Sequence, residues 1–533
     1  MPHSATPGSS PPVPTPTSEE FEQMEQDSPV KTAKNADETE TVGDITMADV
    51  NAMPQPEDQE PKKEVKLDEL FADDDLDEDD EFPSTGRTTQ SQILPTSSPG
   101  PDSSADTSAG APIKASASDP EVMRSFYQRL FPWRYLFQWL NHSPTPTNDF
   151  GHREFAFTLQ NDVYLRYQSF PTADLIRKGV IQTLPTRFEI GPVYSTNPRD
   201  RKQLKNLSAF RSISKELCFD IDLTDYDDIR TCCDKANICI KCWQFITMAI
   251  RVVDVALRED FGFKHIMWVY SGRRGAHAWV CDKKARTMDD QKRRAVAGYL
   301  EVLKGGAQSG KKVNVRRPLH PHLTRSLEIL KTHFSEDVLE RQDPWDTDER
   351  AEKLLSLLPD KNLNDALRRK WASAPGRSSK SKWADIDAVT KAGGASKGLD
   401  TRDLLAAKQD IVLEYTYPRL DIEVSKKLNH LLKSPFVVHP GTGRVCVPID
   451  TRPGKLEEFD PEDVPTVQNL LGEIDAWTEE EVDDEKKSLP DWEKTSLKPY
   501  IEQFRSFVNA LMKDERGEVK VKREREESES MEF

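Results

Sequence analysis

The 533-residue sequence is acidic overall, with 92 Asp and Glu against 74 Lys and Arg and a net charge of −18. Residues 1–120 carry 27 acidic and 7 basic side chains, which leaves the rest of the chain near neutral and able to gather Arg and Lys around a nucleic acid. There is no run of 18 apolar residues, and Met1–Val30 has no apolar core with basic flanks, so we predict neither a membrane span nor a secretory signal.

Residues 1–120 are rich in Pro, Ser and Thr, and they include the acidic run Asp73–Glu81. Few aromatic residues are present to nucleate a core, so we expect a disordered acidic N-terminal extension. Within it, Val65–Phe71 resembles a short motif that becomes ordered on a partner, although most segments of this kind are simply solvated.

Residues 121–287 predict the first part of an α/β domain. Apolar residues at helical spacing indicate a helix over Val122–Leu140, and a second amphipathic helix is expected over Trp243–Phe261. Alternating apolar and polar residues predict strands. These expected strands are Phe155–Leu159, Val163–Phe170, Glu216–Leu223, His265–Tyr270 and His277–Cys281.

Residues 288–410 are highly charged with a helical pattern, and we expect a partly flexible helical insertion with breaks at Pro375–Ser381 and Gly393–Gly398. Residues 411–512 are expected to complete the α/β domain, and 513–533 to form a charged disordered tail. The expected elements of 411–512 are strands at Tyr417–Val424 and Arg444–Ile449 and a helix at Pro499–Met512. The fold class is therefore mixed α/β, interrupted by helices.

Asp220 and Asp222 stand two residues apart in the apolar run Leu217–Leu223, so a strand would present both carboxylates on one face. Paired carboxylates repel unless a cation neutralises them, and oxygen ligands suit Mg²⁺ or Mn²⁺. Asp421, flanked by apolar residues, is the candidate third carboxylate of a two-metal site. Two acids at a strand end are more often structural or solvated than catalytic.

The turn Ser271–Gly275 contains Arg273 and Arg274 and is followed by His277. Glycines permit close backbone approach, and guanidinium groups bind phosphate through paired hydrogen bonds, so the turn suits a triphosphate. An exposed hairpin with solvated arginines is an equally good interpretation. Lys433 and His439 add a cation and a donor shortly after Asp421.

Seven cysteines are too few and too uneven in spacing for a disulfide framework, and four of them lie within eleven residues. Cys232, Cys233, Cys239 and Cys242 have the residue types and spacing of a closed tetrahedral Zn²⁺ site, which predicts a structural zinc motif over 232–242. Because Cys232 and Cys233 are adjacent, one of them could instead be merely buried. The other three cysteines are expected in the core.

Taken together, several blocks resemble the small catalytic subunit of archaeal and eukaryotic DNA primases, and most closely a eukaryotic, fungal-like form. The blocks occur in a consistent order between Phe126 and Ile449. They are Tyr127–Pro132, His152–Phe155, Tyr164–Phe170, Glu216–Asp228, the four cysteines, Phe261–Val280, Tyr417–Ser425 and Asn429–His439.

The resemblance implies a primase-type sheet with an RNA-recognition-like core and an inserted helical subdomain. It implies that Asp220, Asp222 and Asp421 bind two catalytic Mg²⁺ or Mn²⁺ ions and that the four cysteines bind Zn²⁺. It also implies a set of nucleotide-binding residues. These are Glu154, Arg166, Ser271, Arg273, Arg274, His277, His430, Lys433 and His439.

The activity that the resemblance implies is DNA-directed synthesis of short RNA primers de novo, from ribonucleoside triphosphates on single-stranded DNA, in the nucleus. Its expected partners are the DNA template, the RNA primer, an iron–sulfur large primase subunit, and the catalytic and accessory subunits of DNA polymerase alpha. No membrane partner is expected. Two rival functions stay open, a repair primase-polymerase that prefers deoxynucleotides and a non-catalytic nucleic-acid-binding module.

Overall fold

The computed structural model describes residues 119–531 except for 161, 303–312, 314 and 480–488. The expected N-terminal extension and the Val65–Phe71 motif therefore lie outside the described residues. No helix in the described part of the chain is long and apolar enough to cross a membrane.

The first helical segment differs from the sequence prediction. A single helix was expected over Val122–Leu140, but the chain forms α1 (Pro120–Arg129) and α2 (Trp133–Asn141), followed by the single turn α3 (Asn148–Gly151). Pro132 separates the first two because proline has no N–H to donate and disfavours helical geometry in the residue before it. Both helices bury aromatic side chains against the first sheet, so the expected apolar face is retained.

The first sheet, sheet A, has five antiparallel strands in the order β2-β1-β3-β4, with β8 also paired to β3. Its strands are β1 (Arg153–Thr158), β2 (Tyr164–Gln168), β3 (Arg187–Tyr194), β4 (Ser212–Ser214) and β8 (Leu432–Lys433), and α4 (Ala173–Thr183) follows β2. Sequence patterns missed β3, which contains Gly191 and Pro192. A Cβ at Gly191 would lie 2.8 Å from Leu431 Cδ2 and 3.0 Å from Glu154 Cβ, so a larger residue there would require the Leu431 side chain to shift.

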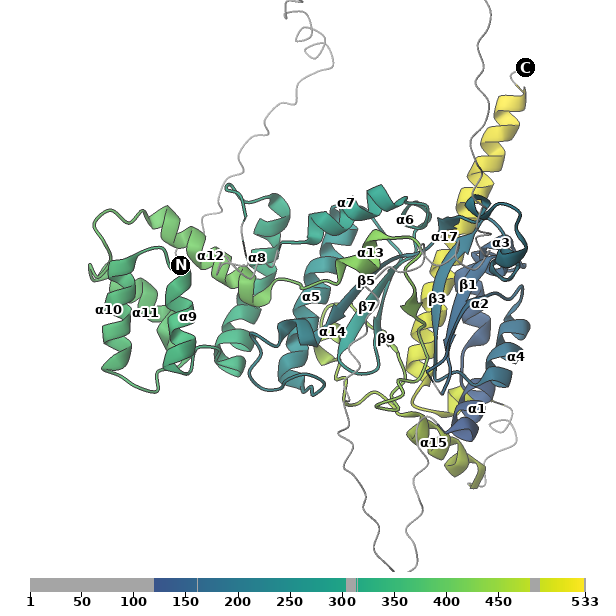
Figure 1. The fold of residues 1–533 in the computed structure, drawn as a ribbon, viewed down its shortest axis with the longest axis horizontal. Helices are drawn as coiled ribbons and strands as arrows, with labels where there is room; N and C mark the ends of the chain where they lie inside the picture. The colour runs from purple at the N-terminus through teal and green to yellow at the C-terminus, as the bar shows by residue number, and fades with distance from the viewer. Residues whose placement is uncertain (1–118, 161, 303–312, 314, 480–488, 532–533) are drawn as a thin grey trace, which may run out of the picture. The chain divides into compact units, whose positions relative to one another are not determined.

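The second sheet, sheet B, has the order β5-β7-β6-β9, and all of its pairs are antiparallel. Strands β5 (Leu217–Asp222), β6 (Ile266–Tyr270) and β7 (Gly275–Val280) match expected strands, and β9 (Pro448–Ile449) is shorter than expected. Figure 1 shows β5 and β7 side by side. Helix α5 (Ile240–Glu259), which includes a long buried stretch, supplies much of the adjoining core.

The segment after β7 is helical, as expected. It contains α6 (Lys283–Arg286), α7 (Asp290–Leu300), α8 (Pro321–His333), the π-helix η5 (Phe334–Gln342), α9 (Asp348–Leu357), α10 (Lys361–Ala372), α11 (Ser379–Lys391) and α12 (Thr401–Thr416). The expected break at Pro375–Ser381 ends earlier than predicted, because the Ser378 side chain accepts a hydrogen bond from the Ser381 N–H and caps α11. Gly393–Gly398 separates α11 from α12.

One expected strand of the C-terminal part is wrong. Tyr417–Val424 is not a strand: its last residues begin the short helix α13 (Ile422–Lys426). The expected helix Pro499–Met512 is longer than predicted, because α17 (Lys498–Met531) continues into a segment rich in Glu, Lys and Arg, which are good helix formers. The remaining elements here are α14 (Lys455–Glu458), α15 (Val467–Glu479) and the 3₁₀ turn η6 (Asp491–Lys494).

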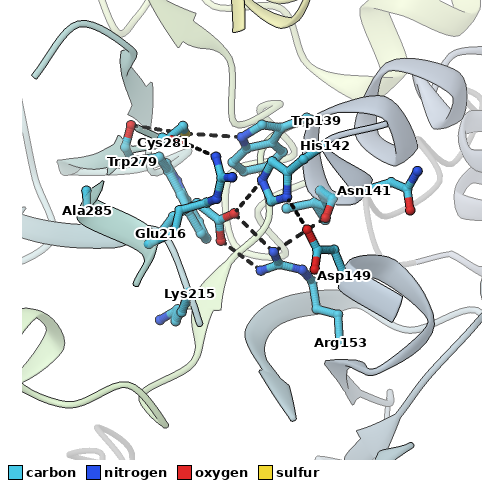
Figure 2. Close-up of polar contacts among 12 residues, drawn as sticks. Trp139, Asn141, His142, Asp149, Arg153, Lys215, Glu216, Trp279, Cys281 and Ala285 are labelled. Carbon is cyan, nitrogen blue, oxygen red and sulfur yellow. Dashed lines mark hydrogen bonds and ion pairs between the residues drawn. The ribbon is translucent and has the colours of Figure 1, made fainter. Parts of the chain in front are cut away.

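A buried ion pair joins the two sheets (Figure 2). Arg153 begins β1 in sheet A, and Glu216 immediately precedes β5 in sheet B. The two guanidinium Nη atoms donate to the two Glu216 carboxylate oxygens at 2.7 and 3.0 Å, and both side chains are fully buried. His142 Nε2 lies 3.4 Å from Glu216, and its Nδ1 lies 3.1 Å from Asp149. Burial opposes ionisation of Glu216, but Arg153 and His142 hold its pKa well below the ordinary value.

We predict that Glu216→Gln lowers the free energy of unfolding by about 3–5 kcal/mol, because it leaves the buried Arg153 charge without its carboxylate. Since the folded pKa of Glu216 is depressed, its stabilising contribution is present above the unfolded pKa and is lost as pH falls through the folded pKa. Urea unfolding at pH 7 and at decreasing pH measures both effects. Asp403→Asn, an exposed acid in α12, is the control, and equal stabilities of the two variants would contradict the prediction.

Candidate active site

Three carboxylates meet at the end of β5. Asp220 and Asp222 lie on this strand with one residue between them, so their side chains share a face of sheet B. The Asp421 N–H donates to the Asp220 carbonyl oxygen at 3.1 Å, and the two residues form an isolated antiparallel bridge. Asp421 was expected on a strand, but it is the N-cap of α13, where its side chain accepts from the Glu423 N–H. The three acids line one pocket of about 550 Å³.

The acids of this pocket raise one another's pKa. Burial, followed by the charges of Asp222 and Asp421, raises the pKa of Asp220 to about 7, although Lys433 opposes the shift. Asp225, in the turn η4 (Leu223–Tyr226), has its pKa raised to about 6 by burial and by Asp222 and Asp421. The chemistry of the pocket suits a divalent cation, because such an ion would neutralise the repulsion between the carboxylates.

Asp225 lies in a 3₁₀ turn and also lines the acidic pocket, together with Glu301 at the end of α7 and Arg419. The only sequence signal for Asp225 was its position three residues after Asp222, which places both on one side of a 3₁₀ turn. Glu301 and Arg419 carried no such signal, because they reach the pocket from distant parts of the chain.

Basic groups border the acids. Arg274 Nε lies 2.7 and 2.8 Å from the two carboxylate oxygens of Asp222. His277 faces Asp220 across the β5–β7 pairing, with its Nε2 3.5 Å from the Asp220 carboxylate. Burial and then Lys433 lower the pKa of His277 to about 3, so the ring is neutral at pH 7. One edge of the acidic pocket is therefore cationic, and the histidine adds a neutral polar group.

The Ser271–Gly275 turn packs on the segment that carries Lys433 and His439. Lys433 Nζ donates to the Ser271 carbonyl at 3.1 Å, and the Thr442 hydroxyl donates to the Gly272 carbonyl at 2.6 Å. Gly272 has φ 87°, and a Cβ there would lie 2.6 Å from His439, so both conformation and space require glycine. Burial, Lys433 and Arg273 lower the pKa of His439 to about 3. The structure thus brings together six of the predicted nucleotide-binding residues. These are Ser271, Arg273, Arg274, His277, Lys433 and His439.

Glu154 and Arg166 form a separate group on sheet A. The buried Glu154 carboxylate accepts from Arg166 Nε, the Tyr167 N–H and the Tyr194 hydroxyl, each at 3.0 Å. Among the described residues, no hydrogen bond or ion pair links Glu154 or Arg166 to the three aspartates. The β3–β8 pairing connects the two groups, because it places Glu189 of sheet A opposite Lys433.

His430, the remaining predicted nucleotide-binding residue, lies just before β8. Its Nδ1 is 2.8 Å from the Leu431 carbonyl, and its own carbonyl accepts from the buried Lys215. His430 is therefore held close to the chain segment that leads to Lys433.

The four clustered cysteines converge, with all four Sγ atoms within 4.8 Å of one another. Three polar groups face the sulfur atoms. The Cys239 N–H lies 3.2 Å from Cys242 Sγ, Gln342 Nε2 lies 3.4 Å from Cys232 Sγ, and Arg230 Nη1 lies 3.8 Å from Cys242 Sγ. Four thiolates with hydrogen-bond donors around them fit a tetrahedral zinc ion without an open position. Cys218, Cys281 and Cys446 are buried, as expected.

Comparison with known proteins identifies one family. Residues 219–451 match the family model described as DNA primase small subunit. The DNA primase small subunit of Schizosaccharomyces pombe is 55% identical over 423 residues, which cover 76% of this chain and 92% of the relative. The Saccharomyces cerevisiae protein of the same name is 43% identical, over 77% of this chain and 97% of the relative. The Drosophila melanogaster protein is 37% identical, over 75% and 94%.

We predict that Asp220→Asn stabilises the metal-free protein at pH 8 by about 2 kcal/mol, because it removes one of the repelling charges. The folded pKa of Asp220 is raised, so the wild type regains this stability by taking up a proton as pH falls below about 7. The difference should therefore shrink as pH falls through about 7 and vanish near pH 4, the ordinary pKa of an Asp in the unfolded chain. Thermal melting with and without Mg²⁺ measures it, and Mg²⁺ should stabilise the wild type more than the variant. A destabilised variant at pH 8 would contradict the prediction.

We predict that Cys239→Ser removes bound zinc and lowers the melting temperature, because structural zinc contributes its binding free energy to folding. A zinc chelator should lower the melting temperature of the wild type but have no further effect on the variant. Metal analysis of both purified proteins is the accompanying measurement. A wild type that melts normally after complete zinc removal would show the prediction to be wrong.

Proposed function

The chain belongs to the DNA primase small subunit family, and on that premise we propose that it synthesises RNA primers de novo on single-stranded DNA by two-metal nucleotidyl transfer. Membership of this family makes the chain an enzyme of primer synthesis in DNA replication. The proposal extends that role to the reaction chemistry and to the residues that carry it.

The meeting of Asp220, Asp222 and Asp421 in one pocket is the observation that carries the proposal. Asp421 is far from the other two in sequence, yet a backbone hydrogen bond fixes it beside Asp220. A purely binding protein for nucleic acid gains nothing from clustered acids, because phosphates repel them. The arrangement supports metal-assisted phosphoryl transfer instead.

In the proposed reaction, a ribonucleotide 3′-oxygen bonds to the α-phosphorus of the incoming ribonucleoside triphosphate while the bond to pyrophosphate breaks. Two bound Mg²⁺ or Mn²⁺ ions would lower the cost of ionising the 3′-hydroxyl and neutralise the departing pyrophosphate. Asp220, Asp222 and Asp421 would hold these ions. Arg274 would exchange its contact with Asp222 for one with phosphate.

The basic edge of the pocket would position the triphosphate. Arg273, Arg274 and Lys433 supply positive charge, and Ser271 and the neutral His277 and His439 supply hydrogen-bonding groups without adding charge. Glu154, Arg166 and His430 are assigned to nucleotide binding from the family resemblance. Lys433 on β8 pairs with Glu189 on β3, so it belongs to the same sheet as Glu154 and Arg166.

The remaining parts of the proposal come from the resemblance to the primase family. They are a primase-type sheet with an RNA-recognition-like core, structural zinc on the four cysteines, and a nuclear location. The proposed macromolecular partners are single-stranded DNA template, RNA primer, an iron–sulfur large subunit and the DNA polymerase alpha subunits. The clustered Sγ atoms support the zinc assignment.

We predict that the wild-type chain makes short RNA on unprimed single-stranded DNA with ribonucleotides and Mg²⁺ or Mn²⁺. Asp220→Ala/Asp222→Ala should reduce product at least ~100-fold, because the metal ligands are lost. Asp403→Asn is the control, since this acid is exposed outside the pocket. Gel analysis of labelled products measures both, and a parallel reaction with deoxynucleotides separates a primase from a repair primase-polymerase. Equal synthesis by wild type and double variant would sink the site assignment.

A further inference from the structure

The connection between β3 and β4, residues 197–211, is strongly basic. This β3–β4 loop contains five basic residues and one acid, Asp200. The basic residues are Arg199, Arg201, Lys202, Lys205 and Arg211, of which all but the half-buried Arg201 are exposed. The loop includes two 3₁₀ turns, η2 (Pro198–Gln203) and η3 (Leu207–Ala209).

These charges are not neutralised within the described part of the chain, where none of the five basic residues forms an ion pair. Other arginines of the protein do have acidic partners: Arg251 contacts Glu457, Arg368 contacts Glu352, and Arg325 contacts Asp260. Five unpaired cations on one loop produce a positive potential that attracts a polyanion.

The loop is held in a defined position by hydrogen bonds and ring stacking, so its basic side chains present positive charge at a defined surface. At its base, the Ser195 N–H donates to the Arg211 carbonyl, and the Ser195 hydroxyl donates to the Ala209 carbonyl. The Phe210 ring stacks on Tyr194, with centroids 4.1 Å apart and planes inclined by 8°. The Tyr194 hydroxyl donates to Glu154, so the loop rests on the Glu154–Arg166 group described above.

Aromatic rings lie beneath the basic groups. The Arg199 guanidinium lies 4.7 Å from the Phe170 ring centroid, and the Arg201 guanidinium lies 4.7 Å from that of Tyr167. On β2, Tyr164 keeps 44% of its surface exposed. Cations interleaved with aromatic rings are the usual composition of a single-strand surface, where phosphates contact the cations and bases stack on rings.

The position of the loop relates it to the pocket. It leaves the end of β3, and an earlier residue of the same strand, Glu189, lies opposite Lys433 of the nucleotide group. The five-residue interval from Glu189 to Tyr194 corresponds to roughly 17 Å along a strand, a length that a few nucleotides can span.

We propose that the β3–β4 loop binds the sugar–phosphate backbone of the single-stranded DNA template a few nucleotides from the reacting pair. The inference rests on the proposed function and adds to it a surface for the template. Two other polyanions have similar charge, the RNA primer and the chain's own acidic run Asp73–Glu81. DNA is favoured because the surface includes the exposed ring of Tyr164, on which an unpaired base can stack.

The test uses the full chain with Arg199→Gln/Lys202→Gln/Lys205→Gln, which leaves Arg201 on Tyr167. Its matched control is Lys391→Gln/Lys397→Gln/Arg402→Gln, in which three exposed residues around the α11–α12 connection lose the same charge. Fluorescence anisotropy of a labelled oligothymidylate, without nucleotides, gives Kd over a series of salt concentrations. Melting temperatures equal to that of the wild type establish that all three proteins are folded.

We expect the loop variant to bind more weakly and the slope of log Kd against log salt to fall by about 2, since each phosphate contact in a single strand contributes ~0.7. The control should retain the wild-type slope. Equal loss in both variants, an unchanged slope, or a loss confined to an RNA oligomer of the same length would overturn the inference. If the loop held the acidic run instead, DNA affinity would be unchanged or would rise.

The template-binding proposal and the proposed reaction can be rejected independently of each other. A chain that binds DNA through this loop but makes no RNA would leave the template surface standing and remove the proposed function. Synthesis that stays dependent on Asp220 and Asp222, with a template KM unaffected by the loop substitutions, would remove the template surface and leave the reaction.

Discussion

The ion pair between Arg153 and Glu216 is the contact on which the arrangement of the two sheets depends. Each side chain is fully buried, so loss of either partner would leave a charge unpaired in a low-dielectric interior. Glu216 directly precedes β5, and Asp220 and Asp222 lie further along that strand. The pair therefore fixes the start of the strand that presents the acids, and it relates that strand to Glu154, the next residue after Arg153.

The pocket has acidic groups on one side and basic groups along its edge. Burial, together with the repulsion between its acids, raises the pKa of Asp220 to about 7, and burial, together with nearby positive charges, lowers the pKa of His277 and His439 to about 3. Both halves suit a magnesium nucleotide, which brings cations to the acids and phosphates to the basic groups. In the folded chain, the repulsion between the carboxylates is unfavourable, and the proposed ligands would remove it. Such destabilising groups are common in sites selected for function rather than stability.

Much of this could be predicted from local sequence. Alternation of apolar and polar residues predicted β5, β6 and β7, and the two-residue spacing of Asp220 and Asp222 predicted that they share one face of a strand. The sequence was less informative where contacts between distant parts of the chain determine the position of a residue. Asp421 is positioned by a bridge to Asp220 rather than by a strand of its own. Asp225 and Glu301 line the pocket only because the fold brings them to it. The length of α17 was also underestimated, because the charged residues that follow Met512 have high helix propensity.

The central claim is that Asp220, Asp222 and Asp421 bind the catalytic metal ions. The most direct measurement is anomalous diffraction from crystals of the protein grown with Mn²⁺ and a non-hydrolysable ribonucleoside triphosphate. The account predicts two manganese peaks ~3.5–4 Å apart, coordinated by these three carboxylates and by the triphosphate. Manganese bound only at other acids, with the three aspartates free of metal while the nucleotide is present, would contradict it.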